Sequence, residues 1–589
     1  MDRSAIEAIY PLSPLQQGML FHTLYAPSSG TYFEQFAFTL RGALDEAAWE
    51  AAWERVTERH AVLRSAFAWE KREKPLQIVS RAARAPWRRE DWRGLAEEER
   101  RARFEAFLRE DRERGFELGR APLMRLALLR VADDAREFVW SHHHLLLDGW
   151  SVGLVLGEVF ELYEAFRAGE QITRPAPRPF REYVAWLGKR DPAAAEAFWR
   201  GELRGFRAPT PLGIDRGARA GAAGEYGEER LDLSPEATAA LAELARHRRV
   251  TLSTVVQGAW ALLLARYSGE DDVVFGATVS GRPAELPGVD RMVGLFINAV
   301  PVRVRVPSGA LLAPWLQELQ ARQAETREHE HAPLVDVRAW SELPAGEPLF
   351  DSLLIFENFP VDASASEPRG GVEVAGFRAF ERTNYPLTLV VAPAEGLVLR
   401  AMYEADRLDP AAVRRMLGHL RTLLEAAARD PEARLGELPL LGAEERAREL
   451  EAWNATEAEF PRGERIHDRF EAVAARTPDA VALTFRGESL TYSELNRRAN
   501  GVARRLSALG VGPESRVAVC LERGPEMVAA LLGVLKAGGA YVPVDPAYPA
   551  ERVAFVLEDA AVPVLLTQER LLGTIPSFGG GIIALDTPH

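Results

Sequence analysis

A run of three histidines, three leucines, an aspartate and a glycine, His142 to Gly149, interrupts an otherwise apolar segment of the chain. Residues 136–147 have the composition of a buried strand, and the apolar run that starts at Val152 has that of a helix. Imidazole and carboxylate groups inside such a segment need hydrogen-bond partners, because burying them unpaired is costly. The fold therefore has to gather several polar groups at a strand-to-helix junction.

The three histidines differ in the predicted direction of their side chains. Because side chains alternate along a strand, we expect His142 and His144 on one face and His143 on the other. For His142 we favour a hydrogen bond to the backbone over a place beside reacting groups. A neutral imidazole carries one donor and one acceptor nitrogen and titrates near neutral pH, which suits proton handling on an amine or hydroxyl nucleophile.

The residues after the histidines predict a turn and the start of a helix. Asp148 and Gly149 are typical of a turn that ends a strand, and Asp148 is predicted to be a structural carboxylate. Gly149 is expected to supply backbone freedom near the reacting groups, and Ser151 to cap the following helix.

Composition and charge narrow the possible classes of protein. The 589 residues are enough for three to four units of about 150 residues each. A formal net charge of −14 gives no support for nucleic-acid binding, which needs clustered positive charge. The single cysteine, Cys520, excludes an intrachain disulfide and cannot by itself build a metal site. The start of the chain lacks a signal peptide, and no apolar run reaches transmembrane length, so we expect a cytoplasmic protein that contacts no membrane and holds no metal.

Helices and strands alternate along the chain, which predicts an α/β fold. The pattern predicts strands over 31–40 and 273–279, and helices from Leu44 onward, over 253–267 and over 410–428. Residues 281–283 are expected to begin a loop. Three prolines in residues 171–180 indicate a linker, so residues 1–175 and 176–445 are predicted to form two halves of similar type.

Six segments occur in an order that resembles the condensation domains of non-ribosomal peptide synthetases. They are Tyr10–His22, Glu58–Phe67, His143–Gly149, Phe180–Trp186, Val293–Arg303 and Phe350–Pro360. The resemblance implies two lobes of the chloramphenicol acetyltransferase type, arranged as a V-shaped pseudo-dimer with the active site where they meet.

Beyond about residue 440 the chain resembles a different domain of the same enzymes. Residues 446–465 look like the linker to an adenylation domain, and segments 490–495 and 535–545 resemble its first two motifs. We expect residues 466–589 to be a truncated, inactive adenylation fragment, because the family's phosphate loop and C-terminal lysine are missing. Gly579–Gly581 is no substitute, since no Gly-Lys-Ser/Thr follows it.

The resemblance implies peptide-bond formation between two carrier-bound thioesters. An acceptor aminoacyl amine attacks the carbonyl of a donor peptidyl or aminoacyl thioester, and the donor's thiol leaves. His144 matches the family's second motif histidine at the centre of a substrate tunnel and is the catalytic candidate. It acts either as a general base or as a positioning group, and His143 is assigned an orienting role.

The resemblance also suggests roles for other residues near the motif. We expect Asp148 to form a structural ion pair with Arg64. Four residues are assigned to the substrate tunnel, each with packing or sheet structure as the competing interpretation: Trp150, Ser151, Gly294 and Asn298.

Other functions of related domains have to be weighed against condensation. An epimerisation domain shares the histidine motif but is not normally joined directly to an adenylation domain, and a heterocyclisation domain carries paired aspartates instead. A starter domain that acylates an amino acid, a free-standing coenzyme A acyltransferase and a non-catalytic recruitment platform complete the alternatives. The intact His144 and the trailing adenylation segment favour condensation.

The predicted partners are carrier proteins rather than cofactors bound by this chain. Phosphopantetheine is expected on an upstream donor carrier and on a downstream acceptor carrier. Because the motifs begin about ten residues from Met1, the donor is expected from another polypeptide, with the short leader of residues 1–14 as a docking region.

Overall fold

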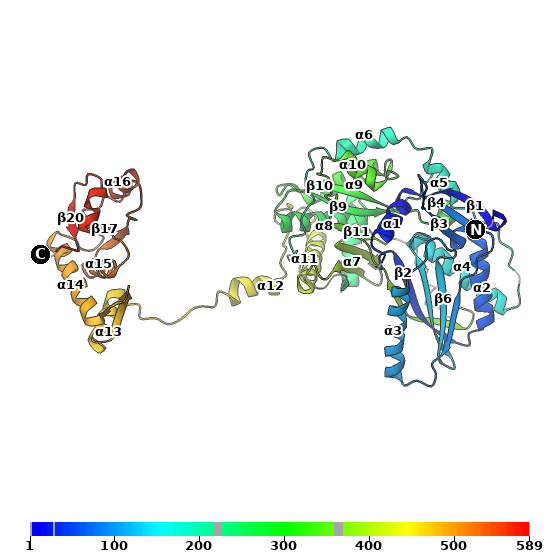
Figure 1. The fold of residues 1–589 in the computed structure, drawn as a ribbon, viewed down its shortest axis with the longest axis horizontal. Coiled ribbons are helices and arrows are strands. Elements are labelled where there is room, and N and C mark those ends of the chain that lie inside the picture. The colour runs from blue at the N-terminus through cyan, green and yellow to red at the C-terminus, as the bar shows by residue number, and fades with distance from the viewer. Residues whose placement is uncertain (1–2, 28–29, 171, 216–225, 358–368, 588–589) are drawn as a thin grey trace. The chain divides into compact units, whose positions relative to one another are not determined.

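The computed structural model describes residues 3–27, 30–170, 172–215, 226–357 and 369–587. It divides into two compact units, Met1–Ala452 and Trp453–His589, which are considered separately (Figure 1). Gln171 and residues 358–360, which belong to the linker and the last condensation motif of the sequence analysis, lie outside the described residues.

A five-stranded sheet organises the first half of the first unit. Its strands, in spatial order, are β12 (Val372–Phe380), β2 (Phe33–Gly42), β7 (Ala135–His143), β6 (Met124–Ala132) and β5 (Trp87–Asp91). Helices α2 (Glu46–Arg59) and α4 (Gly149–Arg167) pack together against this sheet, where Trp49 and Trp53 of α2 contact Phe138 of β7. Rings of this size supply much of the buried apolar area that holds the layers together.

Further elements complete this half of the unit. A second, three-stranded sheet joins β1 (Ile6–Pro11), β4 (Leu76–Ser80) and β3 (Ser65–Ala68). The remaining helices of this half are α1 (Pro14–Tyr25), α3 (Glu97–Arg114) and α5 (Arg181–Leu187), whereas α6 (Pro192–Glu202) contacts α10 (Leu334–Trp340) of the second half. Part of the predicted docking region belongs to the fold, since Ile6 and Glu7 lie in β1, and Met1 and Asp2 lie outside the described residues.

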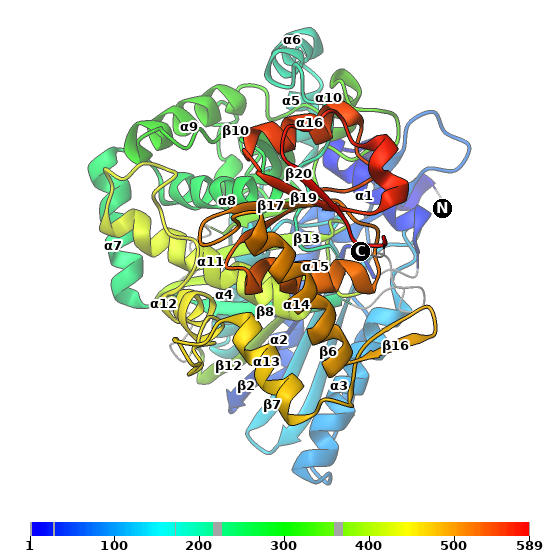
Figure 2. The ribbon, with the colours of Figure 1, turned by 90° about the vertical axis from the view of Figure 1, so that its left-hand side faces the viewer.

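A six-stranded sheet organises the second half. Its strands, in spatial order, are β10 (Asn298–Arg305), β9 (Asp272–Val279), β11 (Ser352–Phe356), β13 (Leu387–Pro393), β14 (Leu397–Glu404) and β8 (Tyr226–Asp232). The helices of this half are α7 (Pro235–Arg248), α8 (Leu252–Ser268), α9 (Leu312–Arg327), α10 (Leu334–Trp340) and α11 (Pro410–Arg429). Helices α7, α8 and α11 contact one another and α9 contacts α8, and these four helices enclose the apolar core with the sheet (Figure 2).

One strand crosses from the second half of the chain into the first sheet. The neighbours β11 and β13 are parallel in the six-stranded sheet, yet the chain between them leaves that sheet and forms β12, which pairs antiparallel with β2. A division at residue 175 stays a prediction, and it would separate β12 from the sheet to which it is hydrogen-bonded.

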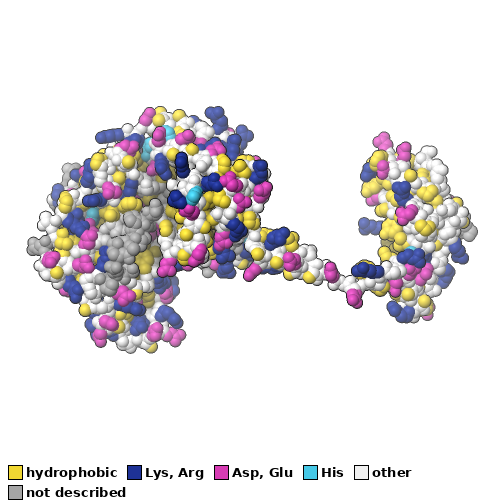
Figure 3. All heavy atoms as spheres, turned by 180° about the vertical axis from the view of Figure 1, so that it is seen from behind, with side chains coloured by type: hydrophobic (Ala, Val, Ile, Leu, Met, Phe, Trp, Pro, Cys, Tyr) yellow, Lys and Arg dark blue, Asp and Glu magenta, His cyan; other side chains and the backbone are white. Residues whose placement is uncertain are grey.

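The strands and helices predicted at 31–40, 44 onward, 253–267, 273–279 and 410–428 are confirmed as β2, α2, α8, β9 and α11. Residues 172–179 form neither helix nor strand. Across the described ranges, no helix combines the length and apolar character needed to cross a bilayer. Basic and acidic side chains intermingle on the face of each unit drawn in Figure 3.

The second unit contains a parallel sheet with helices, as expected for an α/β fragment. The strand order is β18 (Ala540–Pro543), β17 (Arg516–Val519), β19 (Val564–Thr567) and β20 (Gly581–Ala584). A separate hairpin pairs β15 (Val481–Phe485) with β16 (Glu488–Thr491). The helices are α13 (Ile466–Arg476), α14 (Tyr492–Ala508), α15 (Pro525–Lys536) and α16 (Ala550–Asp559).

The end of the first unit is also helical, in α12 (Ala443–Ala447) and a short π-helix at Arg448–Ala452, so the predicted linker is not irregular throughout.

Gly42 lies opposite the first residue of the crossing strand β12, so a substitution there tests how closely the two strands pack. Its φ is +117°, and a Cβ there would lie 2.3 Å from the carbonyl oxygen of Gly371, beside the start of β12. Gly42→Ala should destabilise the first unit by about 2 kcal/mol or more, because the backbone of β12 has to move. Gly169 also has a positive φ but open space around it, so Gly169→Ala should cost only about 1 kcal/mol. Urea unfolding of both variants measures the difference, and equal losses would contradict this role of Gly42.

Candidate functional site

The histidine motif lies where β7 ends and α4 begins. The strand ends at His143, and residues 144–147 form a turn instead of the continued strand predicted from their apolar character. The turn is closed by the bond from the Leu146 amide to the His143 carbonyl, and all three leucines are fully buried. Because a tight turn can bury apolar side chains as well as a strand can, composition alone did not mark the strand's end.

Asp148 is the N-cap of α4 and links the junction to a distant segment of the chain. Its Oδ1 accepts a hydrogen bond from the Ser151 amide at 2.8 Å, and its Oδ2 accepts one from the Phe296 amide at 2.9 Å. Its own amide donates to the Gly294 carbonyl at 3.1 Å. The prediction that Ser151 caps the helix is therefore wrong, because Asp148 stands three residues earlier and satisfies the free amides first.

The predicted ion pair between Asp148 and Arg64 is also wrong. Asp148 pairs with Arg282, whose Nη2 lies 3.1 Å from Oδ1, and both side chains are almost completely buried. Arg64 instead pairs with Glu7 at 2.7 Å and donates to the Ser80 carbonyl at the edge of the three-stranded sheet. Arg282 lies 134 residues after Asp148, in a loop whose position beside the junction could not be predicted from the sequence.

The residues assigned to the tunnel all have structural contacts. The Ser151 hydroxyl donates to the Gly294 carbonyl at 2.8 Å and accepts from the Gly294 amide and from Arg282. A Cβ on Gly294 would lie 2.3 Å from the Phe180 ring, so only glycine fits there. Asn298 donates to the carbonyls of residues 330 and 332. A place for these residues in a tunnel stays a prediction.

Two further expectations concern the start of α4. Trp150 is partly exposed, and its Nε1 donates to the Asp290 carbonyl at 2.9 Å. Gly149 begins the helix and is not among the glycines with positive φ. The predicted need for backbone freedom at Gly149 is therefore wrong, because any residue adopts a helical φ.

His143 and His142 are buried and neutral. The Nδ1 of His143 accepts a hydrogen bond from the Leu145 amide at 3.1 Å, which holds the turn, and burial together with the charge of His144 lowers its pKa to about 3. The ring of His142 stacks on Trp140, and neither of its nitrogens has a partner among the described residues. The predicted hydrogen bond from His142 to the backbone is therefore wrong. The orienting role of His143 stays a prediction that its bond to the turn supports.

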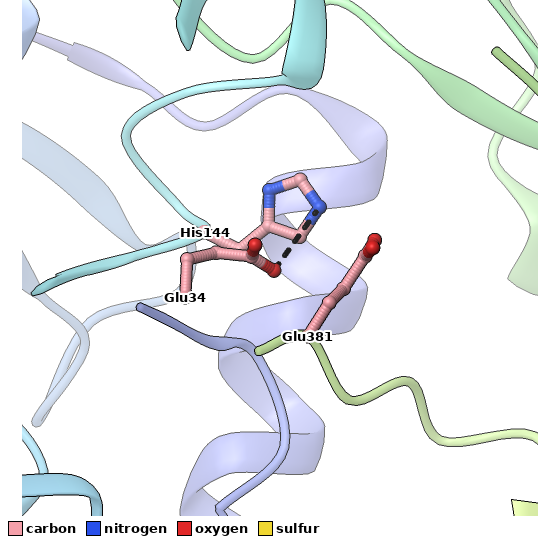
Figure 4. Close-up of side chains that lie close together, drawn as sticks. All are labelled: Glu34, His144 and Glu381. Carbon is pink, nitrogen blue, oxygen red and sulfur yellow. Dashed lines mark ion pairs between the residues drawn. The ribbon is translucent and has the colours of Figure 1, made fainter. Parts of the chain in front are cut away.

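The ring of His144 is fixed by the turn in which it lies. Its backbone amide donates to the Tyr32 carbonyl, and its Nδ1 lies 2.7 Å from the Leu147 carbonyl. A carbonyl only accepts hydrogen bonds, so Nδ1 carries a proton, and in the neutral ring Nε2 keeps a free lone pair. Nε2 lies 3.9 Å from Oε1 of Glu34, and the ring is partly exposed (Figure 4). The expected shared face of His142 and His144 does not apply, because His144 lies beyond the end of the strand.

Two carboxylates that the sequence analysis missed face His144. Glu34 comes from β2 and Glu381 follows β12, and one atom each of Glu34, His144 and Glu381 lie within 4.8 Å of one another (Figure 4). Glu34 is opposite His142 in the β2–β7 register, so its diagonal neighbour is residue 144. A glutamate inside the apolar segment FEQFAF was the available signal, but only the strand pairing shows what it faces.

The electrostatic environment of this cluster is unusual. Burial, followed by the charges of Glu381 and Glu357, raises the pKa of Glu34 well above its ordinary value, and Arg400 opposes the shift. Burial and Glu381 likewise raise the pKa of Glu357 to about 7. Arg400 lies 3.6 Å from Glu381. Shifts of this kind concentrate at functional sites, so the cluster is a second reason to place the chemistry at His144.

A double-mutant cycle tests the observed ion pair against the one that was predicted. Asp148→Asn and Arg282→Leu should be coupled by about 1–3 kcal/mol of unfolding free energy, because they share a buried contact. Asp148→Asn and Arg64→Leu should instead add within about 0.5 kcal/mol. Chemical unfolding of the single and double variants gives both values, and coupling to Arg64 would contradict the observed pairing.

Glu34 is predicted to make stability depend on pH. The pKa of Glu34 is higher in the folded protein than in the unfolded chain. Below the unfolded pKa the side chain is protonated in both states and does not affect stability. As the pH rises toward the folded pKa, the unfolded chain ionises first, so stability falls. Glu34→Gln removes this penalty, so its Tm should exceed that of the wild type by more at pH 8 than at pH 5. Calorimetry at the two pH values measures the difference. An equal margin at both would refute the raised pKa.

Comparison with known proteins identifies the family. The condensation domain family matches residues 6–450, and the AMP-binding enzyme family matches residues 470–580. One of the proteins that make up the linear gramicidin synthase of Brevibacillus parabrevis is 47% identical over 585 residues, which is 99% of this chain and 11% of that protein. The chondramide synthase of Chondromyces crocatus is 40% identical and spans the whole chain, which covers 16% of it. The chain therefore spans a small part of the length of the curated relatives that it matches.

Solved structures agree on the fold. A holo four-domain nonribosomal peptide synthetase bound to AMP and glycine matches 99% of this chain and 45% of its own, with a TM-score of 0.81 and 20% identity. The first condensation domain of the calcium-dependent antibiotic synthetase, in complex with a substrate analogue, matches 74% of this chain with a TM-score of 0.63. The expected α/β fold class, with condensation and adenylation parts, is confirmed. The chain belongs to the condensation domain family of nonribosomal peptide synthetases, and its condensation domain is followed by part of an AMP-binding domain.

Proposed function

We propose that the first unit forms a peptide bond between a donor peptidyl or aminoacyl thioester and an acceptor aminoacyl thioester. The observation that carries this proposal is the orientation of His144, whose Nδ1 donates to the Leu147 carbonyl and whose Nε2 is left as an acceptor. An unprotonated Nε2 in a partly open position is what an attacking amine requires as a hydrogen-bond partner. Membership of the condensation family supports the same reaction.

The reaction needs orientation and proton transfer more than activation, because a thioester is already a reactive acyl donor. The amine nitrogen attacks the donor carbonyl carbon, the new C–N bond forms, and the C–S bond breaks. His144 Nε2 accepts the proton that the nitrogen loses, and this proton then passes to the departing sulfur. Glu381 lies beside the imidazolium that forms in between and favours it electrostatically.

Asp148 and Arg282 act by holding this geometry rather than by touching substrate. Their ion pair fixes the end of the turn that carries His144, and a histidine displaced by about 1 Å loses much of its effect. We assign the chemistry to the first unit alone, because His144 and the carbonyl that fixes its ring both lie within residues 6–450, which match the condensation domain family.

The proposed partners are carrier proteins that present their substrates on phosphopantetheine arms. One carrier delivers the donor and a second delivers the acceptor, and the arm belongs to the carriers rather than to this chain. The proposal places the protein with its carriers in the cytoplasm. A recruitment platform of the same fold would bind the carriers without using His144, so the test below separates the two functions.

His144→Ala should lower the rate of dipeptide formation by about 10²–10⁴-fold, because the amine loses its proton acceptor. The assay combines the chain with loaded donor and acceptor carriers and follows the carrier-bound dipeptide by mass spectrometry. Binding of the acceptor carrier, measured by titration, should remain at the wild-type level. Dipeptide formation at an unchanged rate would refute the catalytic role.

His142→Leu is the matched control for this variant. His142 belongs to the same run of histidines and directly precedes the family motif, but its ring nitrogens have no partner among the described residues. Its replacement by an apolar side chain should keep activity within about threefold, since no hydrogen bond is lost. A loss as large as that of His144→Ala would show that the assay reports damage to the junction and not proton transfer.

A further inference from the structure

Glu34 is a buried carboxylate that the proposed reaction does not yet use as a binding group. It is 6% exposed, and its Oε1 has no hydrogen-bond partner among the described residues. This oxygen points toward the space between His144 Nε2 and Glu381 (Figure 4). An unpaired buried carboxylate is costly, so its position calls for a ligand that pairs with it.

The charges around this space favour a cationic ligand. Glu34, Glu357 and Glu381 influence one another electrostatically, and Arg400 is the positive group that lowers the pKa of both Glu34 and Glu357. When all three carboxyl groups are ionised, the single guanidinium does not balance them, and burial together with this repulsion raises the pKa of Glu34 and of Glu357. A bound cation would reduce this repulsion.

The spacing of the three ligand atoms distinguishes an ammonium group from a metal ion. An ammonium nitrogen that donates about 2.8 Å hydrogen bonds in tetrahedral directions places its acceptors about 4.6 Å apart. A zinc ion with bonds of about 2.1 Å requires ligand atoms only about 3.4 Å apart. The atoms here lie within 4.8 Å of one another, and His144 Nε2 is 3.9 Å from Glu34, which is already wider than zinc requires.

We propose that Glu34, Glu381 and His144 Nε2 form the binding subsite for the α-ammonium group of the acceptor substrate. This inference rests on the proposed function and names the part of the acceptor that the site recognises. An aminoacyl thioester carries an ammonium near neutral pH, and an ammonium has no lone pair for attack. The Glu34 carboxylate takes one of its three protons and becomes a neutral acid, which leaves an amine with a free lone pair beside His144.

The raised pKa of Glu34 is compatible with this proton transfer. A carboxyl group of ordinary pKa would hold a proton from an ammonium only weakly. Burial and the neighbouring charges of Glu381 and Glu357 bring the pKa of Glu34 closer to that of the amine. His144 then has a separate task, since its Nε2 accepts the second proton that the nitrogen loses as the C–N bond forms. The two bases thus serve two successive deprotonations.

Stable analogues of the acceptor test the subsite without turnover. The probes are the glycyl and glycolyl amides of aminopantetheine, which differ by an ammonium or a hydroxyl at the same carbon. The full chain should bind the glycyl probe about 10- to 100-fold more tightly at pH 7, the range of a charge-assisted contact. Glu34→Gln and, independently, Glu381→Gln should reduce this preference to about threefold or less. Calorimetric titration measures each Kd.

Controls separate charge recognition from damage to the fold. Glu137→Gln changes a partly buried carboxylate on β7 that bonds to Thr39, and it should keep the wild-type preference. At pH 9 the glycyl probe loses its charge, so the wild-type preference should fall as well. Preserved preference in the Gln variants at positions 34 and 381 would overturn the subsite, as would Zn²⁺ binding that Glu34→Gln abolishes and that displaces the glycyl probe.

Failure of the proposed ammonium subsite can be told apart from failure of the proposed condensation function. If the wild type forms no dipeptide with any loaded carrier pair, the condensation function fails, whatever the probes show. If it forms dipeptide but the Gln variant at position 34 binds both probes like the wild type, only the subsite fails. Unchanged thermal unfolding of that variant at pH 5 establishes that it is folded in either case.

Discussion

The buried contact between Asp148 and Arg282 is the interaction on which the rest of the site depends. One carboxylate caps α4, accepts the Phe296 amide and pairs with a guanidinium from a distant loop. Burial makes such contacts strong when every oxygen is satisfied, and damaging when one partner is lost. Because the same residue ends the turn that begins at His144, this contact fixes where the imidazole can lie.

The site is assembled from segments that are far apart in the chain. His144 follows β7, Glu34 lies in the neighbouring strand β2, and Glu381 arrives only because β12 crosses to pair with β2. The assembly leaves one carboxylate oxygen of Glu34 unpaired among the described residues, which lowers the stability of the folded state. Natural proteins tolerate such local destabilisation where function requires it. The negative charge around His144 is therefore understood as a feature of binding rather than of folding.

This arrangement suits a reaction whose barrier is mostly one of orientation. A thioester needs no nucleophile from the protein, so in the proposed reaction the chain has to bring an uncharged amine to a carbonyl carbon and manage protons. The turn carbonyl of Leu147 selects the imidazole tautomer, and the carboxylates provide the opposite charge for an ammonium or an imidazolium. The two halves of the unit thus contribute different residues to the proposed site.

The sequence by itself determined the α/β class, several helices and strands, the family and the candidate histidine. Those features follow from local periodicity and from ordered motifs, which depend on residues close in the chain. Only the tertiary structure decided that Arg282 and not Arg64 pairs with Asp148, that Asp148 caps α4, and that Glu34 and Glu381 face His144. The physical reason is that a buried charge pairs with whatever the strand register and the loop crossings bring within a few ångströms, and no local pattern encodes that distance.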